Sequence, residues 1–177
     1  MLVHFTPDGI MEKGKEEYME EESVDFELTS SAFSDHGMIP KKYSGQGDDI
    51  SPPLAWGGEP AGTKSFALIV DDPDAPAGTF VHWVVYDLPA SAHGLPENVE
   101  HSDKLSNGTR QGKNTMLKTG YSGPMPPTQK PHRYFFKLYA LDTVPDLKPG
   151  AHKKELLKAM EGHTLGETQL VGIYQKQ

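Results

Sequence analysis

The sequence predicts a mostly antiparallel β domain with few short helices. Its 177 residues include 18 glycines and 15 prolines, which interrupt the chain throughout and leave little room for long helices. The apolar residues between them form short runs rich in β-branched and aromatic side chains, a pattern typical of strands. Only residues 151–161 carry a convincing helical pattern. The length is that of one domain of ordinary size.

We expect residues 1–23 to be an acidic N-terminal extension of a domain that spans residues 24–177. Six glutamates lie between positions 12 and 22, and such a density of like charge is typical of solvated chain. We assign no dedicated function to this extension. From residue 24 onward the chain changes to short apolar runs separated by turn residues.

Five segments of this domain are expected to form strands because they are short, apolar and bounded by turn residues. They are the segment around Phe26 and Leu28, extending toward Phe33, and then Ser65–Val70, Thr79–Leu88, Arg133–Leu141 and Leu170–Tyr174. Two long stretches, residues 40–53 and 89–131, show little periodicity. An aperiodic stretch longer than 40 residues is more often folded over a functional site than idle.

The charge and the composition exclude several classes of protein. The formal net charge is −8 and the lysines and arginines form no cluster, so a nucleic-acid partner is disfavoured. The absence of cysteine excludes disulfides and thiolate chemistry, and it agrees with a reducing cytosol. The chain shows no signal-peptide pattern, and its longest apolar run is too short to cross a bilayer. We therefore expect a cytoplasmic protein that is not integral to a membrane.

The densest group of acidic residues that can carry chemistry is the turn 71–76, which reads Asp-Asp-Pro-Asp-Ala-Pro. It directly follows a predicted buried strand, and its two prolines stiffen it. Its carboxylates can serve as hydrogen-bond acceptors, as metal ligands or as a general base. The alternative is that these aspartates simply favour a turn, where their side chains accept bonds from nearby backbone N–H groups.

The strand predicted after this turn carries a single histidine. Strict alternation would place Phe80, His82, Val84 and Tyr86 on one face, so His82 would be the only ionisable group there. A histidine in such a place is more often a core residue than a ligand. Antiparallel pairing of this strand with the preceding one would bring His82 near Asp72, which strengthens the interpretation as a ligand.

A third group lies in the loop 120–127 and in the strand that follows it. The glycines and prolines of this loop can expose backbone N–H groups to an anion, and His132 and Arg133 enter the sheet beside it. The planar fork of Arg133 suits a phosphate or a carboxylate. An ion pair between Arg133 and Asp72 or Asp74 is an equally strong interpretation.

The three groups occur in an order and spacing that resemble a known family. The segment Asp72–Pro76 looks like a first signature, Val81–Val85 looks like the strand that follows it, and Gly123–Tyr134 looks like a second signature. Together they resemble the phosphatidylethanolamine-binding protein (PEBP) family, also called the Raf-kinase-inhibitor-like family. The segments Ala159–His163 and Gly172–Tyr174 are similar to its bacterial and archaeal branch.

This resemblance implies a PEBP-like antiparallel β-sandwich with a small pocket for anionic head groups such as phosphate, phosphorylethanolamine or acetate. The ligand-binding residues that it implies are Asp72, His82 and His132, with Tyr121, Gly123 and Tyr134 along the wall. Asp74, Pro76 and Arg133 look like supporting residues. We expect His132 to lie at the rim of the pocket and to be more exposed than His82.

The resemblance also implies a binding protein rather than an enzyme, with no cofactor and no metal. Some relatives inhibit kinases or proteases, so a protein target of either kind is compatible with the sequence, as is a homodimer. The alternative that we keep is a metal-dependent hydrolase. Asp72, His82 and His132 would then be its metal ligands, because two histidines and a carboxylate can bind a metal in a facial arrangement.

Overall fold

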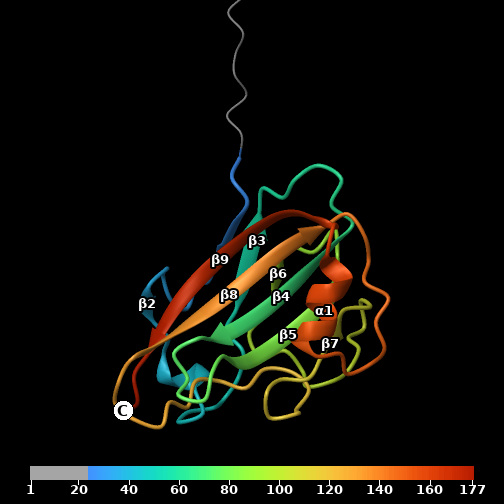
Figure 1. Cartoon of the computed structure of the whole chain (residues 1–177). Coiled ribbons are helices and arrows are strands. Elements are labelled where there is room, and N and C mark those ends of the chain that lie inside the picture. The colour runs from blue at the N-terminus through green and yellow to red at the C-terminus, as the bar shows by residue number, and fades with distance from the viewer. Residues whose placement is uncertain (1–23) are drawn as a thin grey trace, which may run out of the picture.

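Two β-sheets pack face to face in the computed structural model, which describes residues 24–177 (Figure 1). The predicted acidic extension, residues 1–23, lies outside the described residues. The smaller sheet has the order β1-β3-β6, with strands Glu27–Thr29, Leu54–Gly57 and Gly94–Leu95. The larger sheet has the order β2-β9-β8-β4-β5-β7, with strands Gly37–Met38, Thr164–Tyr174, His132–Leu141, Ser65–Asp72, Phe80–Pro89 and Arg110–Gln111.

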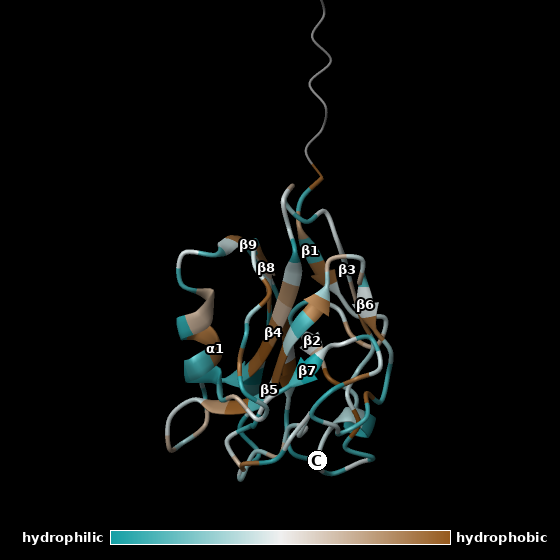
Figure 2. Ribbon diagram, turned by 90° about the vertical axis from the view of Figure 1, so that its right-hand side faces the viewer, coloured by the Kyte–Doolittle hydropathy of each residue, from teal (hydrophilic) through white to brown (hydrophobic). Residues whose placement is uncertain are grey.

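The strands pair antiparallel in both sheets, except that β2 pairs parallel with β9. Helical structure within the described part is limited to the 3-10 turn η1 (Lys41–Tyr43) and the helix α1 (Lys153–Met160). Figure 2 shows α1 on one side of the larger sheet and the smaller sheet on the other. The predicted mostly β fold with few short helices is therefore confirmed. No helix of residues 24–177 is both long enough and apolar enough to cross a bilayer.

The expected segments form strands or helix, and the differences lie at their ends. Strand β1 contains Leu28 but neither Phe26 nor Phe33, which flank it and still contact the inner core. Strand β9 begins at Thr164, six residues before the apolar segment Leu170–Tyr174 from which it was predicted. The helix is about one turn shorter than predicted and begins after His152, whose backbone N–H donates to Glu155 Oε2 at 3.3 Å.

Strand β4 is the centre of the molecule, and all eight of its residues are buried. Phe66, Leu68 and Val70 point into the core between the two sheets, which we call the inner core. Ala67 and Ile69 point to the opposite face and pack in a second core beneath α1. Such a strand is buried on both faces, which explains why its sequence is continuously apolar instead of alternating.

Strand β5 carries a β-bulge at His82, which the sequence did not predict. Val81 pairs with Asp71 and Trp83 pairs with Val70, so His82 is an extra residue opposite β4. The expected alternation is therefore wrong beyond His82, because one extra residue reverses the faces of the residues that follow it, as far as a second register shift that returns Leu88 to the inner core. Downstream of the bulge, Trp83 and Val85 enter the inner core, and Val84 and Tyr86 face α1.

Candidate functional site

A cavity of about 430 Å³ lies at one end of the larger sheet. Strand β4 ends there, and strands β5 and β8 begin there (Figure 1). The loops 73–79 and 115–127 complete its walls. The sequence-predicted residues that line it are Asp72, Pro76, His82, Gly123, His132 and Tyr134. The antiparallel pairing of β4 with both β5 and β8 therefore brings together side chains up to 62 residues apart in the sequence.

Asp72 and His132 form a buried pair in this cavity. The Nδ1 atom of His132 lies 2.7 Å from the Oδ2 atom of Asp72, and both side chains are about 95% buried. A carboxylate accepts hydrogen bonds when it is ionised, so Nδ1 is the donor and carries the ring proton. The bond fixes the orientation of the ring and leaves its Nε2 atom for the cavity.

The second oxygen of Asp72 holds the acidic turn. Its Oδ1 atom accepts a hydrogen bond from the backbone N–H of Asp74 at 2.8 Å. The carboxylate of Asp74 in turn accepts bonds from the backbone N–H, Nε and Nη2 of Arg133, each at 2.9 Å. These bonds to Arg133 lower the pKa of Asp74 to about 2. The predicted ion pair of Arg133 is thus made with Asp74, and this pair supports the cavity from outside.

His82 is oriented by a backbone carbonyl rather than by a carboxylate. Its Nδ1 atom donates to the carbonyl oxygen of Ser122 at 2.6 Å, while the N–H of Ser122 donates to the carbonyl of His82 at 3.0 Å. A carbonyl oxygen can only accept, so the proton of the neutral ring is on Nδ1. The Nε2 atom of His82, like that of His132, makes no hydrogen bond with any residue of the described chain.

Asn114 positions the loop that carries Ser122. Its side-chain nitrogen donates to Ser122 Oγ at 2.9 Å, and its side-chain oxygen accepts bonds from the backbone N–H groups of Met116 and Lys118. Asn114 is buried, so these bonds satisfy an amide that would otherwise be costly to bury. Asn114 and Ser122 could not be predicted as site residues, because no local pattern connects an asparagine in a loop with a histidine more than 30 residues before it.

Both histidines are equally buried, which corrects the expectation that His132 would be the more exposed of the two. The exposed fraction is 4% for His132 and 5% for His82. The loop 120–127 covers the start of β8, and Gly123, Pro126 and Pro127 share the cavity walls with His132. Burial is the main cause that lowers the pKa of His82, although the bond to Ser122 and the charge of Asp72 oppose the effect.

Tyr134 supplies a third polar atom. Its ring lies near both imidazoles, with ring centroids 5.1 Å from His82 and 6.4 Å from His132. Its hydroxyl is buried and has no hydrogen-bond partner among residues 24–177. Burial also raises the pKa of Tyr134, so the hydroxyl keeps its proton. A buried hydroxyl without a partner is costly, and a ligand in the cavity can provide the missing acceptor.

Two residues predicted for the wall have other contacts. Tyr121 does not line the cavity, because its ring packs against Trp83 and its hydroxyl donates to the carbonyl of Tyr43 at 2.7 Å. Gly123 lines the cavity, but its N–H donates to Asp49 Oδ1 at 2.6 Å and is not free for an anion. A side chain at position 123 would collide with the carbonyl of Tyr43, so the loop requires glycine there.

Much of the wall around the polar atoms is apolar. The ring of Phe80 lies tilted against that of His82 with ring centroids 4.6 Å apart, and Pro126 and Pro127 add to the same surface. Met116 and Met125 line the cavity as well, although 50% and 62% of their surfaces are exposed. Met125 and the two prolines belong to the loop 120–127, which the sequence had indicated as part of the site. Met116 belongs to no motif or alternating pattern, so it could not be predicted.

The residues of the cavity do not have the geometry of a metal site. No group of three or more histidines and carboxylates between residues 24 and 177 is arranged to hold a metal ion. Both oxygens of Asp72 are engaged, one by the ring of His132 and the other by the N–H of Asp74. Asp72 therefore orients the ring of His132 and has no free oxygen with which to serve as a metal ligand beside it.

The fold and the cavity together define an antiparallel β-sandwich protein with a histidine-lined pocket. Residues 29–175 match the family model described as phosphatidylethanolamine-binding protein. The chain therefore belongs to the phosphatidylethanolamine-binding protein family, and the resemblance seen in the sequence is confirmed.

Relatives and solved structures agree with this assignment. A UPF0098 protein of Methanothermobacter thermautotrophicus is 52% identical over 149 residues, which cover 84% of this chain and 98% of the relative. The crystal structure of a putative PEBP homolog from Chlamydia trachomatis has a TM-score of 0.79 at 43% identity, covering 86% of this chain and 98% of the other. Escherichia coli YbcL, described as a new member of the mammalian PEBP family, has a TM-score of 0.80 at 31% identity and covers 87% of this chain and 100% of its own.

Proposed function

We propose that this chain is a non-enzymatic binding protein whose cavity takes an anionic head group such as phosphate, phosphorylethanolamine or acetate. One observation carries the proposal. Two ring nitrogens of this cavity, Nε2 of His82 and Nε2 of His132, lack a hydrogen bond to the described chain, and the buried hydroxyl of the wall residue Tyr134 also lacks one. Each can donate to an oxygen of a bound anion, the two imidazoles in their protonated form.

The surroundings of these atoms suit a small anion with a short carbon chain. The carboxylate of Asp72 beside His132 limits the net positive charge of the site, so a singly or doubly charged group is matched better than a large polyanion. The rings and prolines beside the histidines offer contacts to carbon atoms. The exposed side chains of Met116 and Met125 extend this apolar surface to the mouth.

We further propose that binding at this cavity serves a regulatory role, such as inhibition of a kinase or a protease, and that the protein acts in the cytoplasm. Membership of the PEBP family supports a binding role of this kind. The cysteine-free composition agrees with a reducing compartment. We do not propose the metal-dependent hydrolase, because nothing in the arrangement of Asp72, His82 and His132 favours it.

The test is thermal unfolding with and without phosphate and phosphorylethanolamine. A ligand that binds only the native state raises the melting temperature by mass action, so both should stabilise the wild type. His132→Gln should lose this stabilisation. The matched control is His163→Gln, because His163 also holds a carboxylate through Nδ1, Asp142 at 2.7 Å, but is exposed and remote from the cavity. A wild-type melting temperature that neither ligand changes would remove the proposal's support.

A further inference from the structure

A second polar hollow lies on the opposite face of the larger sheet from the cavity. Asp71 and Asp72 are neighbours at the end of β4, and their side chains point to opposite faces. Asp72 bonds His132 in the cavity, whereas Asp71 bonds Lys153 at the start of α1 with an Oδ2–Nζ distance of 2.7 Å. The hollow has a volume of about 320 Å³, and its walls include Asp71, Thr79, Phe135, Lys137, Lys153 and Gln169.

The hollow carries an excess of positive charge. Lys137 Nζ lies 3.6 Å from the same Oδ2 atom that bonds Lys153, so two ammonium groups share one carboxylate. Asp71 is 2% exposed, while the side chains of Lys137 and Lys153 keep 37% and 27% of their surfaces exposed. An ammonium group has three donors, and at most one of each lysine points to Asp71. The remaining donors are available to an acceptor in the hollow.

The buried carboxylate explains how two like charges stay together. Two ammonium groups repel each other more strongly near a sheet than in water, because the local dielectric constant is lower. Asp71 offsets one of the two charges and holds both groups at the same place. The other oxygen of Asp71 is buried and has no partner within residues 24–177. Asp71 is therefore a positioning residue, and the net charge that faces the hollow is positive.

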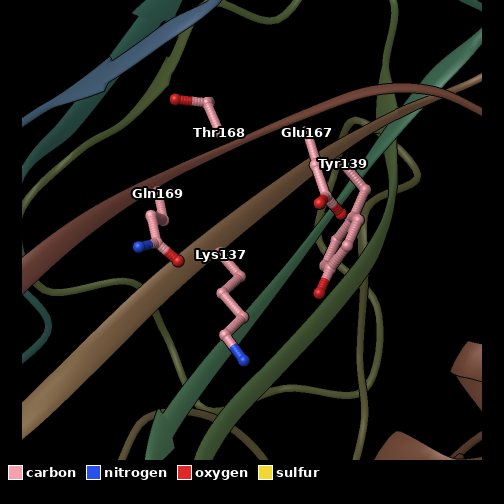
Figure 3. A pocket seen from close by; sticks show the side chains of 5 residues that line it. All are labelled: Lys137, Tyr139, Glu167, Thr168 and Gln169. Atoms are coloured by element: carbon pink, nitrogen blue, oxygen red, sulfur yellow. The ribbon is translucent and has the colours of Figure 1, made fainter.

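An adjoining hollow of about 340 Å³ shares Lys137 and Gln169 with the first. Figure 3 shows the side chains of Lys137, Gln169, Tyr139 and Glu167 on one side of β8 and β9, with Thr168 pointing to the other side. The pairing of Lys137 with Gln169 and of Tyr139 with Glu167 fixes this arrangement. A ligand larger than a bare ion therefore has room beyond the lysines, toward a hydroxyl and a carboxylate.

We propose that this hollow binds an oxyanion, a phosphate or carboxylate group, between Lys137 and Lys153. The two ammonium groups donate charge-assisted hydrogen bonds to the anion, and the hydroxyl of Thr79 and the amide of Gln169 line the same space. Thr79 also lines the cavity of His82 and His132, so the turn 73–79 separates two anion sites on opposite faces. The second site does not depend on the function proposed for the first.

The test is a titration of the ¹⁵N-labelled full chain with inorganic phosphate, followed by nuclear magnetic resonance, and a parallel titration with acetate. Binding should shift the backbone amide signals of Lys137 and Gln169 in addition to those around His82. Lys137→Gln should weaken binding at the outer site at least about tenfold, since it removes one charge-assisted bond. It leaves the bond between Asp71 and Lys153 in place, so the protein should still fold.

Two further variants make the result specific. Lys64→Gln is the charge-matched control, because Lys64 is exposed and lines neither hollow, and it should leave outer-site binding unchanged. His132→Gln should abolish only the shifts around His82. Tighter binding of phosphate than of acetate assigns a phosphate group to the site, and the reverse assigns a carboxylate. The proposal is overturned if neither anion shifts the signals of Lys137 and Gln169, or if Lys64→Gln weakens binding as much as Lys137→Gln.

Discussion

The imidazole of His132 is held by the carboxylate of Asp72 through a buried hydrogen bond of 2.7 Å between the start of β8 and the end of β4. The exposed pair of His163 and Asp142 has the same length but lies in water. Burial makes the difference, because a bond to a charged group shielded from solvent is stronger, and losing one partner leaves the other without compensation. The bond also decides which nitrogen of His132 faces the cavity.

Replacing the carboxylate of this pair should destabilise the protein. Asp72→Asn leaves one acceptor oxygen for two donors, the Nδ1 atom of His132 and the backbone N–H of Asp74. We expect a loss of about 1–3 kcal/mol in the free energy of unfolding. Asp142→Asn, which breaks the exposed counterpart, should cost less than about 1 kcal/mol. Urea unfolding of the two variants at pH 7 measures both. Equal losses would mean that burial does not strengthen the pair of Asp72 and His132.

The hydroxyl of Tyr134 should matter for the ligand and not for the fold. Tyr134→Phe removes a buried donor that has no partner in the described chain, so the free protein should be as stable as the wild type or slightly more stable. The same change should weaken phosphate binding about tenfold, because a donor to a charged group is lost. Calorimetric titration and thermal unfolding of one variant separate the two effects. Unchanged phosphate affinity would place the anion away from Tyr134.

The affinity for a simple anion should fall as the pH rises. The Nδ1 proton of His82 is committed to the carbonyl of Ser122, so Nε2 can donate to an anion only when the ring is protonated. Burial lowers the pKa of His82, and the ring is therefore neutral at pH 7 in the free protein. Binding must take up a proton, which weakens affinity with each step of pH above that lowered pKa.

Acetate is the probe for this pH dependence, since its own charge is constant above pH 5.5. Calorimetry at three pH values between 5.5 and 8, in buffers of different ionisation enthalpy, reports both the affinity and the number of protons taken up. His82→Gln keeps a neutral donor at the site and should flatten the profile. A wild-type profile without proton uptake would contradict a charged His82 in the complex.

Asp87 offers a test that is independent of the cavity. Its side chain is mostly buried near the end of β5, and burial raises its pKa to about 6, while Arg110, whose Nε lies 3.6 Å from Asp87 Oδ2, compensates only in part. The ionised carboxylate of Asp87 therefore lowers the free energy of unfolding above pH 6. This destabilisation is lost as the pH falls from about 6 toward 3.8, the pKa of the carboxyl group in the unfolded chain.

Asp87→Asn should accordingly raise the stability by about 1–2 kcal/mol at pH 7.5 and have little effect at pH 4. Asparagine also suits the left-handed backbone of this position, where φ is 55°. Chemical unfolding of the variant and the wild type at both pH values measures the difference. A loss of stability at pH 7.5 would show that the ion pair with Arg110 outweighs the cost of burial.

The sequence was sufficient to predict the framework of the site. Strands β4, β5 and β8 can be predicted from their apolar composition. Their antiparallel pairing places Asp72, His82 and His132 at one end of one sheet. The acidic turn could be predicted because aspartates and prolines at a strand end restrict the chain locally. These features depend on interactions within short stretches of sequence, so the residue types of each stretch are enough to predict them.

Features that depend on long-range packing could not be predicted. The bulge at His82 reverses the faces of the residues from Trp83 to Tyr86, yet no residue type marks where an extra residue enters a strand. Tyr121 turns into the core because the carbonyl of Tyr43 lies within reach of its hydroxyl, a contact across 78 residues. His132 is buried for a similar reason, since the loop that covers it is shaped by Asn114 and Asp49.

The most direct test of the central claim observes the ring nitrogens of the histidines. Long-range ¹H–¹⁵N nuclear magnetic resonance distinguishes which nitrogen of each imidazole carries a proton, before and after phosphorylethanolamine is added. We predict that His82 carries its proton on Nδ1 alone in the free protein near pH 7. On binding, Nε2 of both His82 and His132 should report a proton shared with the anion, while His163 stays unchanged. A His82 that carries its proton on Nε2 in the free state, or rings that do not respond to the ligand, would contradict the proposed anion site.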